Sequence, residues 1–494
     1  MSETKKEGVK CSPTPECDVE NGVPRSSRPS RVSHVSSIRF SGRTYEECTV
    51  EADVSEDSER VPHTTWWQTA FLMLGEVFGT GVLALPHAAA KLGWVLATMS
   101  LVLFAFFSSY AGTLLARVKN DFLPKSGSYA DMARALVGPR FGLFTRIAIV
   151  SNWVALLPYY LIGAGSSIEN MIDGSFTSCS FVWSAIAVAF VYAASQFTTL
   201  KWISYLSIPS FLAIITATVI LVVEIFRGNI DPQYRSVGSS GSFGAGTSVG
   251  PVWDSSQDGA RAFFNFYSAF ASFVFAYQGQ DLFVEMIAEM INQREAAKAI
   301  TTSYLVMTVC YGLVTVLVYG KLGSNVPGFL PDALLPGGAK TAANCLVAFH
   351  IIVAYAITAN LTCKVFYGLL FPSKPIADAS RRQLSRSMPI RLRWAFVQLL
   401  LVLFCFLVAN AIPAFSAVQE LIGSLFGAPI IFGWPPLFYY KAHRLHGKEI
   451  SCFDGILCAL FFFALFPSFT ILGTVGAVYD IIDALKAASP PFSC

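Results

Sequence analysis

The sequence predicts an all-α integral membrane protein that crosses the bilayer about eleven times, as two inverted repeats of five helices followed by one extra helix. Three observations carry this prediction. Hydrophobic residues make up 54% of the 494 residues and charged residues only 14%, whereas a soluble domain has about 25% charged residues. Apolar runs of membrane-spanning length follow one another along the chain. Two of these runs, the first and the sixth, are interrupted near their centres.

The N-terminal stretch of residues 1–63 is polar. It is rich in Ser, Pro, Glu, Lys and Arg and lacks apolar periodicity, so we expect a disordered cytoplasmic tail. No signal peptide precedes the first apolar run, which must therefore direct insertion itself. Residues 64–480 are predicted to form the transmembrane domain, with repeats at about 64–226 and 261–441, and residues 481–494 a short C-terminal tail.

The apolar runs match the length that a hydrocarbon core of about 30 Å requires. The fourth run is the shortest, and its connection to the fifth is tight. The eleven predicted spans are 66–90, 93–117, 143–171, 181–196, 202–226, 262–290, 299–321, 341–371, 394–412, 416–440 and 455–479.

Basic residues are distributed unequally between the two sets of loops, and this asymmetry predicts the orientation. The loops after spans 2, 8 and 10 hold Arg117, Lys119, Lys125, Arg134, Arg140, Arg146, Lys374, Arg381, Arg382, Arg386, Arg391, Arg393, Lys441, Arg444 and Lys448. The opposite loops hold fewer: Lys91, Arg227, Arg235, Arg261, Lys321 and Lys340. We therefore predict a cytoplasmic N-terminus and a C-terminus on the outer or lumenal side. Plasma membrane and vacuolar or lysosomal membrane both remain open.

The first apolar run, WWQTAFLMLGEVFGTGVLALPHAAAKLGW, contains Gly75, Gly79 and Gly81 near its middle, followed by Pro86. Glycine weakens a helix by about 1 kcal/mol relative to alanine, and proline removes a hydrogen bond. At ~1.5 Å rise per residue, Gly79 lies about 20 Å from Trp66, near the middle of the membrane. The run is therefore predicted to be broken there. Close helix packing through small residues is the alternative explanation.

The sixth run is polar at its centre, where residues 277–281 read YQGQD. Non-helical backbone at this depth is tolerated only where it is buried or lines a cavity. Interruptions at corresponding positions of two halves indicate a binding site between inverted repeats. The half-helix that begins near Gly81 offers free N–H groups to a carboxylate, and the free carbonyls suit an ammonium group or a cation. This arrangement favours amino acids, although other small anions are compatible with it.

Acidic residues within these two runs are the candidates for ion coupling. Glu76 lies about 15 Å into the first run, and a mid-membrane acid costs roughly 2.5–3.5 kcal/mol, so we expect it to face the interior. We interpret Glu76 as a proton carrier or as the partner of a substrate ammonium group. Asp281 and Glu285 share an i, i+4 face of the sixth run, where proton coupling and structural hydrogen bonding are both compatible. Glu289 is interpreted as a solvated helix end.

Enzyme and metal-binding functions are not expected. The suitable loops lack HExxH, GxSxG, Walker A and GxGxxG motifs, and the eleven cysteines include no CxxC pair. We considered one pair, Cys179 with Cys345, as a disulfide on one membrane face. His87 and His350 lie within apolar runs, and hydrogen bonding to a neighbouring helix is the more frequent role of such histidines.

Four segments resemble the amino acid/auxin permease family, the amino acid transporter transmembrane family, over roughly residues 65–480. They are FGTGVLALPHAAAKLGW, SYADMARALVGPRFG, FAYQGQDLFVEMIAEM and AFHIIVAYAITAN. The opening WWQ…GE…GTGVLALP is most similar to the branch of neutral and aromatic amino acid permeases of fungi and other microbes. The resemblance implies a LeuT-type fold and secondary active transport by alternating access. It implies protons, or sodium, as coupling ions and no other cofactor.

The resemblance also assigns substrate contacts to the two broken runs and to the eighth run. The backbone of the first broken run is implied to hold the substrate carboxylate. The residues assigned to substrate binding are Gly79, Thr80, Gly81, Tyr277, Gln278, Gly279 and Thr358. Sodium-coupled members carry an Asn where this chain has Gly75, so its absence favours protons.

A sodium-coupled carrier, an auxin-like carrier of an indole acid and a nutrient sensor on a transporter scaffold remain alternatives. A channel would need a symmetric ring of pore helices, which nothing in the sequence indicates. We expect a monomer in the lipid bilayer, with no nucleic acid partner.

Overall fold

The computed structural model describes residues 64–172, 179–197, 200–235, 243–244, 246–250, 259–372 and 388–487. The chain divides into the units Met1–Glu59 and Arg60–Cys494, and the described residues all belong to the second. The predicted N-terminal tail therefore lies outside the described residues. Within them the secondary structure is helical, with two isolated bridges and no strand.

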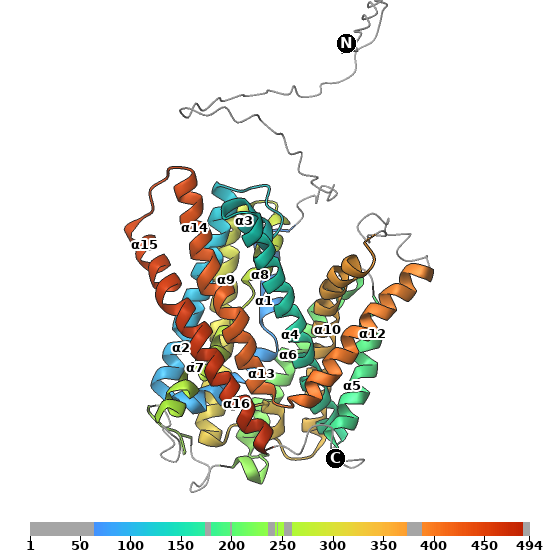
Figure 1. Cartoon of the computed structure of the whole chain (residues 1–494). Helices are drawn as coiled ribbons and strands as arrows, with labels where there is room; N and C mark the ends of the chain where they lie inside the picture. Colours follow the sequence, from blue (N-terminus) through green and yellow to red (C-terminus); the bar gives the residue numbers. More distant parts are fainter. Residues whose placement is uncertain are drawn as a thin grey trace, which may run out of the picture. The chain divides into compact units, whose positions relative to one another are not determined.

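The helices follow one another in the order that the apolar runs predict (Figure 1). The α-helices are α1 (Trp66–Val77), α2 (Leu85–Asp121), α3 (Tyr129–Leu136), α4 (Pro139–Ile172), α5 (Ser180–Ala194), α6 (Leu200–Arg227), α7 (Gly259–Ala276), α8 (Gln280–Ala288), α9 (Ala296–Leu322), α10 (Gly338–Leu370), α12 (Met388–Ala411), α13 (Phe415–Ile422), α14 (Trp434–Leu445), α15 (Cys452–Ala459) and α16 (Gly473–Ala487). Short 3₁₀ segments include η1 (Thr80–Leu83), and π-helical segments include η6 (Gly423–Gly427).

Eight stretches of the described chain are long and apolar enough to cross a membrane. They are Leu85–Asp121, Pro139–Ile172, Leu206–Arg227, Gln293–Asn325, Gly338–Leu370, Met388–Ala411, Phe415–Leu445 and Cys452–Lys486. This agrees with a multi-pass, all-helical membrane protein. The predicted first, fourth and sixth spans correspond to shorter helices, because breaks divide two of them and α5 has only 15 residues. The last helix continues to Ala487, beyond the predicted end at 479.

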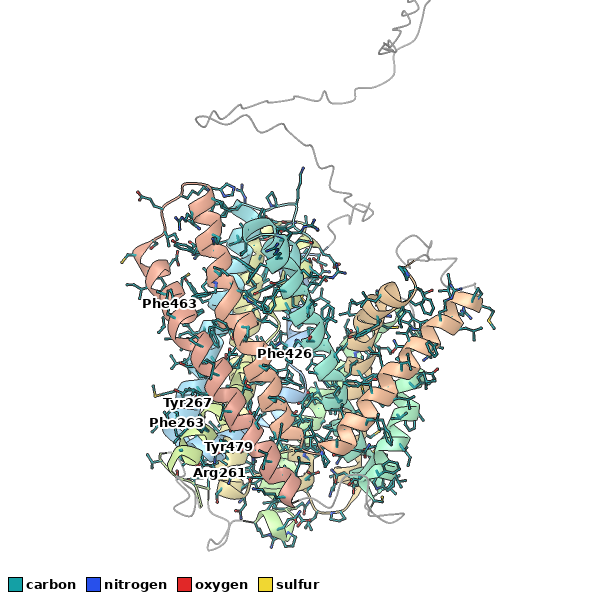
Figure 2. All side chains as sticks on the ribbon, viewed as in Figure 1. Arg261, Phe263, Tyr267, Phe426, Phe463 and Tyr479 are labelled. Carbon is teal, nitrogen blue, oxygen red and sulfur yellow. The ribbon has the colours of Figure 1, made fainter. Side chains whose placement is uncertain are left out.

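Large apolar side chains cover the outside of the bundle (Figure 2). Phe463 is 77% exposed and Ile208 70%, whereas polar residues such as Gln280 and Gln419 are fully buried. A soluble protein rarely exposes apolar surface on this scale. The described bundle is therefore built for a lipid environment, with its polar groups turned inward.

The first predicted interruption is confirmed. Helix α1 ends at Val77, the backbone is non-helical at Gly79 (φ −125°, ψ −144°), and α2 begins at Leu85. A Cβ atom at Gly81 would lie 3.1 Å from the Cα atom of Ala276, which is the last residue of α7. Glycine at 81 thus allows the first break to approach the second break closely.

The second predicted interruption is confirmed between Ala276 and Gln280. A Cβ atom at Gly279 would overlap the side chain of Val77, so this glycine is required by contact with the end of α1. In Figure 1 the broken helices α1 and α8 lie in the centre of the described bundle, between α9 and α4. The two breaks therefore meet, although they are separated by some two hundred residues of chain.

Tyrosine side chains of α9 satisfy the carbonyl groups that the breaks leave free. The Tyr311 hydroxyl lies 3.1 Å from both Val77 O and Ala276 O, the carbonyls at the ends of α1 and α7. The Tyr304 hydroxyl donates to Tyr277 O at 2.9 Å. Buried backbone without a partner is costly in a membrane, where water cannot replace the lost bond. Helix α9 therefore stabilises both broken helices.

Three expectations require correction. We assigned Lys91 to a loop, but it lies within α2, which continues from the first predicted span into the second through a break at Gly93 (φ 73°). The positive φ favours glycine at this position. Lys91 is held in this helix by two carboxylate partners. Arg261 and Lys340, also assigned to loops, lie in α7 and α10. Finally, Cys345 is free, so its suggested disulfide with Cys179 does not form.

We predict that Tyr311→Phe destabilises the protein by about 1–3 kcal/mol, since it takes the hydroxyl donor from the buried Ala276 O and leaves Val77 O with the Gly79 N–H as its donor. Thermal unfolding in detergent would measure the loss. Tyr355→Phe is the matched control, because Tyr355 is equally buried but its hydroxyl contacts only a sulfur, Cys405 Sγ, at 3.8 Å. Equal losses in the two variants would contradict the capping role of Tyr311.

Candidate functional site

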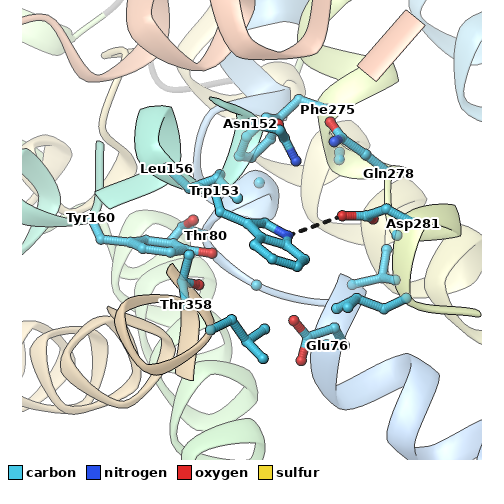
Figure 3. Close-up of a pocket in the computed structure, with 17 residues that line it drawn as sticks. Glu76, Thr80, Asn152, Trp153, Leu156, Tyr160, Phe275, Gln278, Asp281 and Thr358 are labelled. Carbon is cyan, nitrogen blue, oxygen red and sulfur yellow. Dashed lines mark hydrogen bonds between the residues drawn. The ribbon is translucent and has the colours of Figure 1, made fainter. Parts of the chain in front are cut away.

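A cavity of about 80 Å³ lies where the two breaks meet (Figure 3). A bound water needs some 10–15 Å³ in the same measure, so the cavity has room for several waters or a small solute. It is lined by Glu76, Val77, Gly79, Thr80, Gly81, Asn152, Trp153, Leu156, Tyr160, Phe275, Ala276, Gln278, Gly279, Asp281, Leu282, Thr358 and Leu361. The cavity is thus formed by residues of both breaks together with α4 and α10.

Most of the residues that the sequence singled out lie on this cavity. They are Glu76, Gly79, Thr80, Gly81, Gln278, Gly279, Asp281 and Thr358. Tyr277 and Glu285 are not among the lining residues. The Tyr277 side chain is fully buried elsewhere, and its hydroxyl donates to Leu101 O at 3.1 Å. The structure therefore gives Tyr277 contacts that hold the second break in place.

Helix α4 contributes a wall that the sequence analysis missed. Asn152, Trp153, Leu156 and Tyr160 lie on one face of α4 at helical spacing and line the cavity. The segment SNWVALLPYY mixes amide and aromatic side chains within an apolar run. That composition is the signal that could have indicated a cavity-facing stripe. Thr358 and Leu361 of α10 complete this side of the cavity.

Trp153 connects this wall to the second break. Its indole N–H donates to Asp281 Oδ2 at 3.2 Å, and Figure 3 shows the ring between Asp281 and Tyr160, near Glu76. Asp281 lies in the first turn of α8, where the helix dipole favours a negative charge. The indole and the helix end together fix the position of the Asp281 carboxylate.

Polar groups of the cavity can recognise both ends of a zwitterion. The Glu76 carboxyl group faces the cavity, as do the Thr80 and Thr358 hydroxyls (Figure 3). In the described part of the chain, Asn152 Oδ1 and Gln278 Oε1 are buried without a hydrogen-bond partner. Such groups are costly unless a ligand or water pairs with them. Among the described residues there is no cluster of His, Cys, Asp and Glu that could hold a metal ion.

The two intramembrane histidines are engaged with neighbouring elements. His87 Nδ1 lies 2.8 Å from Val326 O, and His350 Nδ1 lies 3.0 Å from Ser210 Oγ. These bonds agree with the structural role we expected. His350 also approaches the first break, since a Cβ atom at Gly79 would lie 3.5 Å from its Nε2 atom.

Comparison of the sequence with known proteins points to one family. The family model described as "Transmembrane amino acid transporter protein" matches residues 62–478. "Amino acid permease 1" of Arabidopsis thaliana is 24% identical, covering 92% of this chain and 97% of the relative. "Lysine histidine transporter-like 4" of the same plant is 21% identical, over 85% and 90%. "N amino acid transport system protein" of Neurospora crassa is 23% identical, over 90% and 91%. The resemblance found in the sequence is confirmed, and the family is one of transporters rather than enzymes.

We predict that Trp153→Phe lowers stability through loss of the bond to Asp281, because a hydrogen bond to a charged group contributes about 1.5–3 kcal/mol. A double-mutant cycle with Asp281→Ala, followed by thermal unfolding, isolates this interaction from the change in ring size. A coupling energy near zero would show that the indole N–H does not hold the carboxylate.

Proposed function

Because this chain belongs to the transmembrane amino acid transporter family, we propose that it is a secondary active transporter that carries neutral or aromatic amino acids across its membrane together with protons. The observation that carries the proposal is the cavity itself. Two helix breaks meet there with the carboxyl groups of Glu76 and Asp281 beside them. Backbone dipoles for a carboxylate and acids for an ammonium group or a proton are thus concentrated in one place.

We propose that the chain crosses the membrane eleven times, in a LeuT-type arrangement of five plus five helices and one more. The shorter α5 and the broken pairs α1–η1 and α7–α8 complete the count beyond the eight long stretches. The breaks fall in the first and sixth crossings, as an inverted repeat requires. The basic loops support a cytoplasmic N-terminus and a C-terminus on the outer or lumenal side. Plasma membrane and vacuolar or lysosomal membrane remain the candidate locations.

The walls of the cavity support a neutral or aromatic substrate side chain. Leu156, Phe275 and Leu361 supply apolar surface, and Tyr160 and Trp153 supply aromatic rings. Aromatic rings pack against each other in stacked or edge-on geometry, which favours a substrate that carries a ring. The substrate carboxylate is proposed to lie at the non-helical backbone of residues 79–81, and its ammonium group near Glu76.

Proton coupling is proposed to act through Glu76, with Asp281 as its partner across the cavity. Both line the same space, so protonation of one acid changes the charge that the substrate meets. Gly75 has no side-chain oxygen for sodium, which supports protons over sodium. A sodium-coupled carrier, a carrier of an indole acid and a nutrient sensor are the alternatives. Uptake of a labelled amino acid panel into proteoliposomes, under proton and sodium gradients imposed separately, distinguishes them.

We predict that Glu76→Gln abolishes accumulation driven by a proton gradient and leaves exchange of amino acids across the membrane, because the amide has the same size but cannot carry a proton. Uptake and counterflow in proteoliposomes measure the two activities. Glu289→Gln, at the end of α8, is the control: its backbone carbonyl accepts from Thr64 N at 3.1 Å, and the substitution leaves that bond intact. Unchanged accumulation in Glu76→Gln would refute the coupling role.

We predict that Gly81→Ala weakens substrate binding about 10- to 100-fold, because overpacking of this contact costs roughly 1–3 kcal/mol. The added Cβ atom would lie 3.1 Å and 3.2 Å from Ala276 atoms and would push the two breaks apart. Gly75→Ala, where nothing lies within 4 Å of the new atom, should bind normally. Calorimetry on the purified variants measures substrate binding. Wild-type affinity in both variants would show that the substrate binds elsewhere.

A further inference from the structure

Three charged side chains from distant parts of the sequence meet outside the candidate site. Lys91 Nζ of α2 lies 2.8 Å from Glu420 Oε1 of α13 and 2.9 Å from Asp480 Oδ2 of α16. The Glu420 side chain is completely buried, and the Asp480 side chain is 18% exposed. The group has one positive charge for two carboxyl groups.

A second relationship links the two carboxyl groups. Both accept from the one Lys91 ammonium group, at 2.8 Å and 2.9 Å, so the two carboxyl groups are neighbours, and a bond between them would require a proton on one of them. Glu420 Oε2 has no partner among the hydrogen bonds of the described residues when both groups are counted as ionised. Neighbouring carboxylates in a low-dielectric site cannot both ionise readily, so such pairs retain a proton.

The groups facing this cluster from the surrounding helices do not supply the missing charge. From α7, the Ser272 hydroxyl lies 3.4 Å from Glu420 Oε1, whereas the Ser268 hydroxyl donates to Asn265 O at 3.0 Å. His87, one turn before Lys91, is engaged with Val326 O. Arg261 of α7 pairs with Asp483, one turn along α16 from Asp480, and Lys486 lies 3.9 Å from the same carboxylate.

Figure 2 shows Arg261 beside Tyr479, whose ring centroid lies 5.6 Å from the guanidinium carbon. Arg261 is thus held on the outer surface of α7 and α16 by the ring and by Asp483. Among the described residues, the salt bridges of Glu420 and Asp480 are therefore to Lys91 alone, so two carboxyl groups share one ammonium group.

Packing around the cluster favours a proton over a metal ion. A Cβ atom at Gly423, three residues after Glu420, would overlap Ala271 O of α7, and one at Gly473 would lie 2.9 Å from Ser424 Cβ. Helices α7, α13 and α16 are thus in close contact on both sides of the charged group. This close contact favours the smallest cation, because a proton needs only the two carboxyl groups, whereas a sodium ion needs several oxygen ligands around it.

We propose that Glu420 and Asp480 form a second proton-binding site, in which Glu420 carries the proton and donates it to Asp480 while Lys91 bonds to both. With the proton bound, the three side chains are neutral as a group and fasten α2 to α13 and α16. When the proton leaves, a net negative charge remains in the bundle and the two carboxylates repel. The pair is expected to titrate as one unit.

The site is close enough to the cavity to act with it. Ser272, which contacts Glu420, lies one helical turn, or about 5 Å along α7, from Phe275 and Ala276 of the cavity wall. A role of this proton in the transport cycle rests on the proposed function, whereas proton binding itself does not.

The test is infrared difference spectroscopy on the full-length protein in lipid vesicles, recorded without substrate while the pH is stepped. A protonated carboxyl group has a C=O stretching band that an ionised one lacks. We expect Glu420→Gln to lose one such band and Glu76→Gln to keep it. If the Glu420→Gln spectrum keeps every protonated-carboxyl band of the wild type, the proposal is overturned.

Asp480→Asn provides a second variant if Glu420→Gln fails to fold. The Glu420 band should then persist and shift in frequency, because its hydrogen-bond acceptor has changed. Persistence without any shift would overturn the pairing of the two groups. If wild-type vesicles transport no amino acid, the proposed function fails, but the infrared result still decides whether this proton site exists.

Discussion

The need to pair every backbone polar group inside the bilayer is the constraint on which this structure depends. Two helices break at a depth where the lipid supplies no water to the backbone. The breaks are tolerated because other protein groups pair with the freed carbonyls. The Tyr311 hydroxyl serves Val77 O and Ala276 O together, and the Tyr304 hydroxyl serves Tyr277 O. Because one helix, α9, supplies both hydroxyls, the breaks are held at one level and form one cavity.

The local features of this site could be predicted from the sequence, since they depend on residues close together in the chain. Glycines at 75, 79 and 81 and the polar segment 277–281 are visible as departures from an apolar pattern, and both breaks occur where these departures lie. Glu76 and Asp281 were found for the same reason, because an acid inside an apolar run is rare.

Features that depend on how helices face one another could not be predicted. Trp153 belongs to an apolar run, and only the packing of α4 against the second break turns its indole toward Asp281. Tyr277 has the same polar context as Gln278, but its ring is directed to Leu101 O rather than into the cavity. Lys91 was assigned to a loop because it is a charged residue between two apolar runs. Its two partners lie 329 and 389 residues away in the sequence, so no local pattern reveals them.

Two of the charged groups in the described bundle, at the cavity and at Lys91, lie beside helix α7. A buried carboxyl group without a full complement of partners is unfavourable in either place, so each group is stable only while a proton, an ammonium group or a lysine completes it. At the cavity that partner can be the substrate, which comes and goes. At the Lys91 group the lysine is permanent, and only the proton is exchangeable. On α7, Ser272 beside Glu420 and Phe275 beside the cavity lie within about one helical turn of each other. Under the two proposals, helix α7 is therefore the element that joins the substrate cavity to the second proton site.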